Sequence, residues 1–470
     1  MGNASWISSI INLLNTIVGA GTLAMPAALS HLGIVPGLML IAWAGLTAGF
    51  GLYLQTRCAR YLERGASSFF ALSQITYPSA AVLFDAAIAI KCFGVGVSYL
   101  IIIGDLMPGV VHGFYGRADE VSYLVDRIFW ITVFMLVAIP LSFLRKLDSL
   151  KYTSVVALLS ITYLVVIVVG HWFAGDTLDR RGPIKVFKPE GALAALSSVP
   201  VLVFAYTCHQ NMFSVLNEIK VNTPARTTGV VFTSIGSACF LYVTVALTGY
   251  LSFGDNVRGN IIGMYSSSIL STIGKAAIVV MVSFSYPLQV HPCRASLDAV
   301  LRWRPSGSAT QRPYTSPSRN PLLPNNNPPK SPATVRAEGM GEARFAILST
   351  VIIILSYIVA ISIHSLERVL AYVGSTGSTS ISFILPGLFY YKISDPHGGF
   401  EELSNGAEDG HNHDADEGLS ANGNGGGKME QQAPTSAWLR RLSLALALYG
   451  TVVMVVSLTT NVYFERKHAQ

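Results

Sequence analysis

The chain has 470 residues, of which 51% are hydrophobic and only 12% are charged, whereas about 25% of the residues of an ordinary soluble domain are charged. This composition excludes a typical soluble domain and indicates an integral membrane protein. The net charge of +6 does not indicate nucleic acid as a partner, because the basic residues divide between the two sides of a membrane.

Apolar stretches long enough to cross a bilayer, which takes about 20 residues, occur eleven times. They predict an all-α membrane protein with spans at residues 6–30, 33–56, 79–108, 128–144, 150–172, 192–216, 227–252, 267–290, 344–363, 366–391 and 437–464. The first stretch is not a cleavable signal, because it lacks a basic n-region and another span follows it at once. Five cysteines lie singly in or beside these stretches, without metal-ligand spacing or a disulfide framework.

The first span is predicted to be a discontinuous helix around Leu13 to Pro26. Gly19 and Gly21 remove side chains where the backbone must approach another group closely, and Pro26 lacks the N–H that would bond back four residues. Irregular backbone at membrane depth is tolerated only where it is buried in protein or lines a polar cavity. The stretch therefore predicts a ligand site, and we expect Gly21→Val to weaken ligand binding without preventing insertion.

The third span carries a lysine, Lys91, close to its middle. A lysine at that depth costs about 2.5–3.5 kcal/mol on insertion scales, so it needs a partner, a water path or a role. The sequence leaves two interpretations open, structural pairing and ion coupling. Gly94 and Gly96 beside it favour close helix packing.

The sixth span contains a second polar interruption, with His209, Gln210 and Asn211 in the apolar stretch from Pro200 to Phe213. Such residues are costly in a membrane unless they face a bundle interior or a water-filled path. A buried histidine bonded to a carbonyl is the alternative. Because five spans separate this break from the first, the pairing predicts an inverted-repeat transporter with a site at the midplane.

Two later spans carry hydroxylated residues. Ser283 and Ser285 of the eighth span precede Pro287, where their hydroxyls either satisfy freed carbonyls or supply oxygen ligands to a small cation. The tenth span runs through Val373 to Thr379 with small residues, for which tight packing is favoured over a polar lining.

Two inserts divide the membrane part into five regions. Spans one to eight (1–302) precede a Pro-rich segment (303–343), spans nine and ten (344–391) precede a Gly-rich acidic segment (392–436), and the last span with its tail occupies 437–470. Both inserts are expected to be disordered. His411, His413 and Asp414 in the second offer metal ligands, but a solvated linker is favoured, since ordering a flexible glycine tract is costly.

The basic residues predict the orientation. With the N-terminus in the cytosol, 20 of the 32 Lys and Arg residues fall on the cytosolic side, where positively charged loops tend to remain. The loop at residues 174–191 is an exception, because it places four basic residues on the opposite side. Both inserts are then cytosolic, where regulatory or sorting proteins are expected partners. The chain shows no P-loop, dinucleotide fingerprint, nucleophile elbow or zinc-type set, so an enzyme is not expected.

Four separated motifs resemble the amino acid/auxin permease family, nearest to its fungal vacuolar amino-acid transporter branch. They lie at Asn15 to Pro26, Ala87 to Pro108, Phe204 to Asn211 and Val373 to Thr379. The resemblance implies a LeuT-like fold of two inverted five-helix repeats plus an eleventh helix, with alternating access coupled to an ion gradient. It covers nearly all of the membrane part and neither insert.

The resemblance also implies roles for individual residues. The backbone N–H groups of Gly19, Ala20, Gly21 and Thr22 would bind a substrate carboxylate at a half-helix end. The carbonyls from Tyr206 through Thr207 to His209 would bind its ammonium. Asn15 and Ser285 match the sodium-site positions of sodium-coupled relatives, but serine stands where those relatives usually have threonine.

We therefore expect a proton-coupled secondary transporter of amino acids in the vacuolar membrane, with no cofactor. His209 is the first candidate for proton coupling, since histidine titrates most readily near neutral pH, and Lys91 is the second. Three alternatives stand beside it: a sodium-coupled transporter, a transporter-like sensor whose ligand does not cross, and a channel. A short N-terminal segment argues against the sensor, and paired broken helices argue against the channel.

Overall fold

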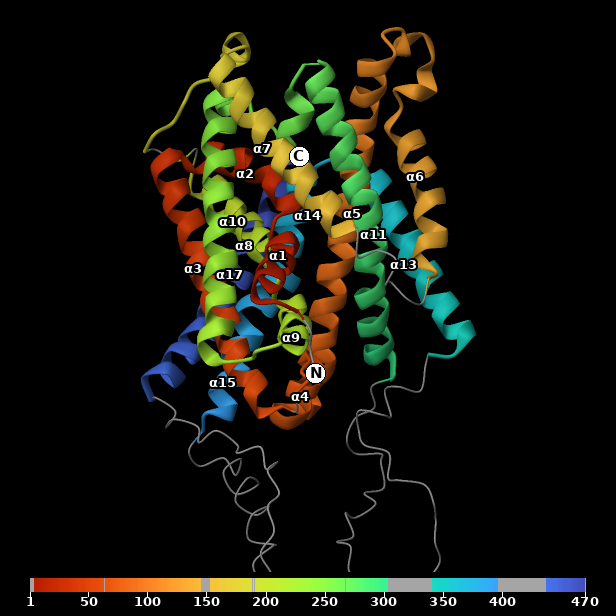
Figure 1. Ribbon diagram of the computed structural model, residues 1–470. Helices are drawn as coiled ribbons and strands as arrows, with labels where there is room; N and C mark the ends of the chain where they lie inside the picture. The colour runs from red at the N-terminus through yellow and green to blue at the C-terminus, as the bar shows by residue number, and fades with distance from the viewer. Residues whose placement is uncertain are drawn as a thin grey trace, which may run out of the picture.

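The computed structural model describes residues 4–62, 64–144, 153–187, 189, 191–266, 268–302, 340–395 and 437–469 of the chain. Helices run along one another through nearly all of these ranges (Figure 1). The described residues form no β-strand, only an isolated parallel bridge between Ala4 and Ile219.

Each of the eleven predicted spans coincides with a helix or with a pair of helices. In chain order they are α1 (Trp6–Ile17) with α2 (Ala20–Leu32), α3 (Ile34–Cys58), α5 (Ala81–Phe114), α6 (Arg127–Ser142), α7 (Thr153–Ala174), α8 (Ala192–Tyr206) with α9 (His209–Glu218), α10 (Pro224–Phe253), α11 (Ile269–Arg302), α13 (Glu342–Ser362), α14 (Leu366–Val373) with α15 (Leu385–Ile393), and α17 (Ala437–Ala469). The short helix α4 (Phe69–Thr76) lies outside the predicted spans.

Length and hydropathy support this assignment. Eight helical segments of the described chain are long and apolar enough to cross a membrane, and the bent pair α1 and α2 makes a ninth. Helix α6 is also apolar, but with 16 residues it is shorter than these segments. Large apolar side chains such as Phe240 and Ile269 are more than 70% exposed on the outside of the bundle, as expected of a surface that faces lipid.

The first span breaks where the sequence predicts. Helix α1 ends at Ile17, Val18 and Gly19 leave the helical conformation, and α2 starts at an angle of 54° to α1. Pro26 lies inside α2 and does not end it. The discontinuity therefore arises at the glycine, where no side chain obstructs the turn.

The second break falls two residues earlier than the polar residues that signalled it. Helix α8 ends at Tyr206, Thr207 and Cys208 are non-helical, and His209 is already the first residue of α9. The polar triplet therefore forms the first turn of a half-helix.

The tenth span keeps a helical path but widens into π-helical turns between α14 and α15, at Gly374–Ser378 and Ser380–Ile384. Such turns leave carbonyls that the regular pattern does not satisfy, and Thr379 Oγ1 donates to the Gly374 carbonyl at 2.6 Å. Glycines permit contact with neighbouring helices, since a Cβ on Gly374 would strike the Pro200 carbonyl of α8. A Cβ on Gly377 would lie 2.8 Å from the backbone nitrogen of Lys91 on α5. The preference for tight packing in this span is confirmed at both positions.

The helix ends that flank the two predicted inserts lie on the same side of the bundle as the N-terminus, as the sequence predicts. The end of α11, the start of α13, the end of α15 and the start of α17 all lie at the end of the bundle that holds the N-terminus, opposite the C-terminus (Figure 1). The predicted inserts themselves, including His411, His413 and Asp414, lie largely outside the described residues. At their base, Asp298 binds Arg302 at 2.9 Å and Arg344 at 2.6 Å.

Candidate functional site

The break between α1 and α2 leaves three consecutive backbone N–H groups without a partner among the described residues. They belong to Gly19, Ala20 and Gly21, and no side chain caps this end of α2. The N–H of Thr22, which the resemblance places in the same set, donates to the Gly19 carbonyl at 3.0 Å. The unpaired groups stand at the positive end of the helix dipole, which favours an anion.

The two glycines of this break have different surroundings. A Cβ on Gly19 would meet no atom within 4 Å, so this residue borders open space. A Cβ on Gly21 would lie 2.7 Å from Ala205 Cβ and 2.8 Å from Ala205 Cα. Gly21 therefore allows α2 to approach α8, and Gly19 borders the space into which the free N–H groups open.

The second break supplies acceptors. The carbonyls of Tyr206 and Thr207 have no hydrogen-bond partner within the described chain, whereas the Cys208 carbonyl accepts from Asn211 N and the His209 carbonyl accepts from Gln55 Nε2. Two free carbonyls thus stand at the negative end of α8, where a cation is stabilised. Of the expected carbonyl set, Tyr206 and Thr207 are the members that remain available.

A tyrosine of α10 joins the two breaks. The Tyr242 hydroxyl lies 2.7 Å from the Ile17 carbonyl, at the end of α1, and 2.8 Å from the Ala205 carbonyl, near the end of α8. Its side chain is fully buried. The sequence carries only a weak signal for this residue, namely that a tyrosine in an apolar span needs a partner for its hydroxyl when it is buried.

Tyr206 contributes its backbone carbonyl to the candidate site, whereas its side chain packs against α3 and Tyr242. The ring lies against α3, where a Cβ on Gly45 would be 3.1 Å from Tyr206 Cζ. It also packs edge to face on Tyr242, with ring centroids 5.0 Å apart. Within the break, Thr207 Oγ1 is 3.1 Å from Ser382 Oγ in the π-helical part of the tenth span.

His209 is enclosed by protein. Its Nε2 lies 3.2 Å from the Ala48 carbonyl of α3, and its Nδ1 is buried without a hydrogen-bond partner among the described residues. With Nε2 donating, Nδ1 is a bare acceptor. The contact between Nε2 and the Ala48 carbonyl agrees with the interpretation of His209 as a buried structural histidine. The unpaired Nδ1 is also compatible with a functional role.

Lys91 lies on α5, where its backbone faces Gly377 of the tenth span. The residue is 4% exposed. The structure gives it no hydrogen bond or ion pair within the described residues. The structural pairing left open by the sequence is therefore not found in the described chain.

The two sodium-site candidates are not joined by a hydrogen bond. Ser285 Oγ donates to the Met281 carbonyl at 2.8 Å, and Ser283 Oγ donates to the Val279 carbonyl at 2.6 Å. These are local bonds to freed helix carbonyls, which is the structural alternative for both serines. Asn15 is partly buried on α1, next to the break.

Protein covers the site at the end that holds the N-terminus. Ala4 pairs with the chain after α9, with its N–H 2.9 Å from the Glu218 carbonyl and its carbonyl 2.9 Å from Lys220 N. Arg64 Nη2 donates to the Lys220 carbonyl at 2.8 Å, which places a cation at the C-terminal end of α9. Ser67 and Asn217 exchange two further hydrogen bonds.

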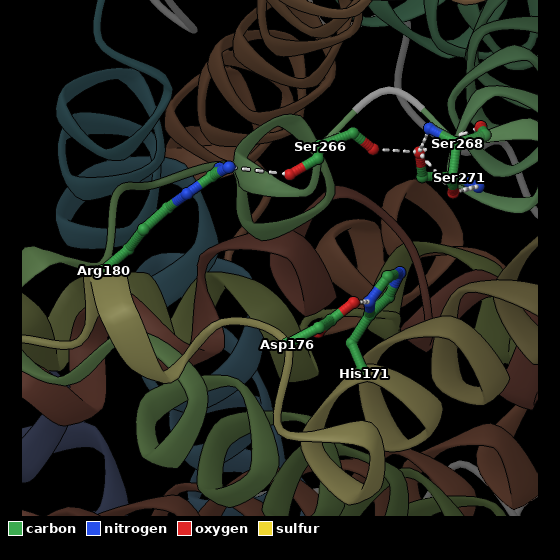
Figure 2. A network of polar contacts seen from close by, with 6 residues as sticks. All are labelled: His171, Asp176, Arg180, Ser266, Ser268 and Ser271. Carbon is green, nitrogen blue, oxygen red and sulfur yellow. Dashed lines mark hydrogen bonds and ion pairs between the residues drawn. The ribbon is translucent and has the colours of Figure 1, made fainter.

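The opposite end is covered by the loop between α10 and α11, which packs against α2 and α5. Figure 2 shows the polar contacts there: His171 Nδ1 lies 2.6 Å from Asp176 Oδ2, and Arg180 Nη2 donates to Ser266 Oγ at 2.9 Å. The His171 ring stacks on Tyr265 at 4.4 Å. Burial raises the pKa of the Tyr265 phenol above its ordinary value, so the phenol remains neutral at physiological pH.

The arrangement matches the charges of a zwitterion. The free N–H groups at the start of α2 carry a partial positive charge and the free carbonyls at the end of α8 a partial negative charge, and the Tyr242 hydroxyl contacts both chain segments. No group of three or more His, Cys, Asp or Glu side chains in the described ranges is arranged to bind a metal.

The chain is similar in sequence to known proteins over nearly its whole length. Residues 2–400 match the family described as transmembrane amino acid transporter protein. The vacuolar amino acid transporter 5 of Schizosaccharomyces pombe is 41% identical over 467 residues, covering 98% of this chain and 95% of that protein. The vacuolar amino acid transporter 5 of Saccharomyces cerevisiae is 38% identical and covers 97% of each chain.

Solved structures with low sequence identity share the fold. The crystal structure of MhsT in complex with L-phenylalanine has a TM-score of 0.55 at 12% identity and covers 96% of this chain and 98% of that one. Mhp1 in a closed conformation has a TM-score of 0.55 at 11% identity, covering 98% and 91%. The predicted LeuT-like fold is confirmed.

Proposed function

Since this chain belongs to the family of transmembrane amino acid transporter proteins, we propose that it moves amino acids across the vacuolar membrane by alternating access, coupled to the proton gradient. The vacuolar location rests on the names of the fungal relatives. The family and these relatives are described as transporters and not as enzymes, and the apolar exterior of the bundle fits a lipid bilayer.

The observation that carries the proposal is the meeting of two broken helices. The N–H groups of Gly19, Ala20 and Gly21 and the carbonyls of Tyr206 and Thr207 have no partner among the described residues, and all of these residues except the partly exposed Gly19 are buried. Unpaired backbone groups at membrane depth are costly. A zwitterionic ligand that bonds both sets removes that cost, which favours an amino acid over an uncharged solute.

The covers at the two ends support alternating access. Contacts of Ala4, Arg64 and Asn217 close one end, and the loop around Tyr265 closes the other. A ligand between two closed ends is released only when one set of contacts opens. This arrangement favours a carrier over a continuous pore.

Uptake by the purified protein in liposomes tests the proposal. Radiolabelled amino acids are expected to accumulate when a pH gradient is imposed across the membrane, and protein-free liposomes provide the control. A transporter-like sensor would bind the ligand without accumulating it, so saturable binding with no uptake would contradict transport.

The coupling ion is proposed to be the proton. Proton coupling needs a group that titrates, and His209 has a buried Nδ1 without a partner beside the break. A proton reaches this nitrogen only when one end opens, which links protonation to the transport cycle. Lys91 is the second candidate. A sodium site would instead use neutral oxygens such as those of Asn15 and Ser285.

Replacing sodium with choline is therefore expected to leave uptake unchanged, and abolishing the pH gradient should remove accumulation. His209→Gln should flatten the pH dependence of uptake more than it weakens substrate binding. Ser285→Ala is the matched control and should have the smaller effect, because its hydroxyl bonds to the Met281 carbonyl of its own helix. Uptake that collapses without sodium, with an unaltered pH profile in His209→Gln, would assign coupling to Asn15 and Ser285 instead.

A further inference from the structure

The loop between α10 and α11 covers the end of the bundle that lies opposite the N-terminus. Its described residues 254–266 include a short 3₁₀ helix, Ile261–Met264, which packs against α2, α5 and α11. The side chains of Ile261, Ile262 and Tyr265 are buried. The loop therefore has to move before a ligand can pass this end of the bundle.

Two of the contacts that hold the loop do not depend on a group that titrates near neutral pH. Lys275 Nζ donates to the Tyr265 carbonyl at 2.9 Å. Arg180 Nη2 donates to Ser266 Oγ at 2.9 Å, as Figure 2 shows. These contacts hold the loop in acid and in neutral solution alike.

A third contact is made by a histidine at the end of α7. The His171 ring stacks on the Tyr265 ring, with centroids 4.4 Å apart and an interplanar angle of 18°. On its other side, His171 Nδ1 lies 2.6 Å from Asp176 Oδ2 (Figure 2). An ionised carboxylate only accepts hydrogen bonds, so Nδ1 already carries a proton and a second proton is taken up at Nε2. The side chain is 17% exposed, so water reaches the ring.

Protonation strengthens both interactions of this histidine. A neutral imidazole forms an aromatic stack with a phenol, whereas an imidazolium over the same ring is also attracted by its π-electrons. The hydrogen bond to Asp176 then joins two ionised groups, which shortens and strengthens such bonds. Burial raises the pKa of the Tyr265 phenol above its ordinary value, so the ring under the imidazolium stays neutral. His171 therefore holds Tyr265 more firmly in its protonated form.

Other ionisable groups border the loop at its edges. At its start, Asp255 binds Lys185 at 2.8 Å and accepts from the Tyr250 hydroxyl at 2.9 Å. At another edge, Glu367 of α14 packs against Gly259, on which a Cβ would lie 2.6 Å from Glu367 Cγ. Helix α1, which also packs against α7, carries no ionisable side chain. The ordinary titration range of histidine lies between about pH 5 and 8, which makes the stacked histidine the first candidate for a response to pH.

We propose that His171 is a proton sensor that fastens the loop between α10 and α11 at acid pH and loosens it near neutral pH. The inference rests on the alternating-access part of the proposed function and adds regulation of one of its two gates. The sensor is separate from the coupling candidate His209, which lies on α9 and bonds to α3. Acid on the side that the loop faces keeps this gate shut for longer, and neutralisation of that side lets it open more often.

Hydrogen–deuterium exchange of the purified full chain in lipid nanodiscs, without substrate, measures how often the loop opens. After correction for the intrinsic effect of pH on exchange, the amides of residues 261–265 are expected to be about fivefold better protected at about pH 5 than at about pH 8, as a cation–π contact implies. His171→Gln should remove this difference. His171→Arg keeps a positive charge over the ring and should show the acid level of protection at both pH values.

His112→Gln is the matched control, because it removes another histidine–aspartate pair. His112 Nε2 lies 3.2 Å from Asp119 Oδ1 at the end of α5, and no hydrogen bond, ion pair or ring contact joins either side chain to residues 254–266 in the described part of the chain. The response of the loop to pH should persist in this variant. Should the His171 variants fail to fold, the parent and Tyr265→Leu still decide the matter, since loss of the Tyr265 ring should also abolish the difference.

Two results would overturn the inference and leave amino-acid transport standing. One is equal protection of the parent loop at both pH values. The other is a difference that survives in His171→Gln, which would assign the response to the edge of the loop at Glu367. Absence of uptake of any amino acid would overturn the proposed function instead, and the exchange measurement, which needs no transport, would still decide whether His171 controls the loop.

Discussion

Gly19→Val is expected to abolish amino-acid uptake in a protein that still folds, whereas Gly21→Val is expected to prevent correct folding, which corrects the expectation from the sequence that Gly21→Val would only weaken ligand binding. The first substitution adds a side chain to a position with no atom within 4 Å, bordering the space in front of the free N–H groups. The second forces a branched side chain into Ala205, whose Cβ lies 2.7 Å from the added Cβ. Overpacking of this kind costs about 1–3 kcal/mol or more.

Two measurements separate these outcomes. Size-exclusion profiles and thermal unfolding in detergent report folding, and substrate-dependent stabilisation reports binding. Gly19→Val should keep the parent melting temperature and lose the shift that substrate produces, while Gly21→Val should melt earlier or aggregate. Parent-like affinity in Gly19→Val would remove the first break from the site.

Tyr242→Phe is expected to reduce both stability and turnover. The substitution removes the one hydroxyl that lies within 3 Å of the Ile17 and Ala205 carbonyls, and both carbonyls are then buried without that donor. Leaving buried polar groups unsatisfied costs about 1–3 kcal/mol. Because the same hydroxyl joins the two breaks, the site geometry should loosen and turnover should fall about tenfold or more.

Tyr286→Phe is the matched control for this prediction. Tyr286 is equally buried, and its hydroxyl lies 2.6 Å from Ser356 Oγ between α11 and α13, away from the two breaks. Its loss should lower the melting temperature to a similar extent and leave turnover per folded protein within about twofold, by the energetics of one hydrogen bond. Equal turnover in the two variants would mean that Tyr242 serves packing alone.

The positions of the spans were predictable because lipid imposes one strong requirement on the sequence, an apolar run with satisfied backbone groups. The first break was predictable for the same reason, since Gly19 and Gly21 interrupt such a run. The sequence could not separate the roles of these two glycines. That distinction depends on Ala205, which is 184 residues away in the chain and contacts only one of them.

The second break shows a different limit. His209, Gln210 and Asn211 marked its neighbourhood, but the non-helical residues are Thr207 and Cys208. Polar side chains can occupy the first turn of a helix, so they signal a helix end without locating it. Tyr242 was missed altogether, because its role lies in two carbonyls contributed by other helices.

The bridge between Ala4 and Ile219 gives the two breaks a mechanical relation. It fastens the start of α1 to the end of α9, so the half-helices on that side of the site are linked far from their own hinges at Val18–Gly19 and Thr207–Cys208. Under the proposed mechanism, rotation at one break would therefore displace the half-helix at the other. A ligand bound to the backbone of both breaks would then set the angle between the linked half-helices, so that the same peptide groups would both bind the substrate and control opening of the path.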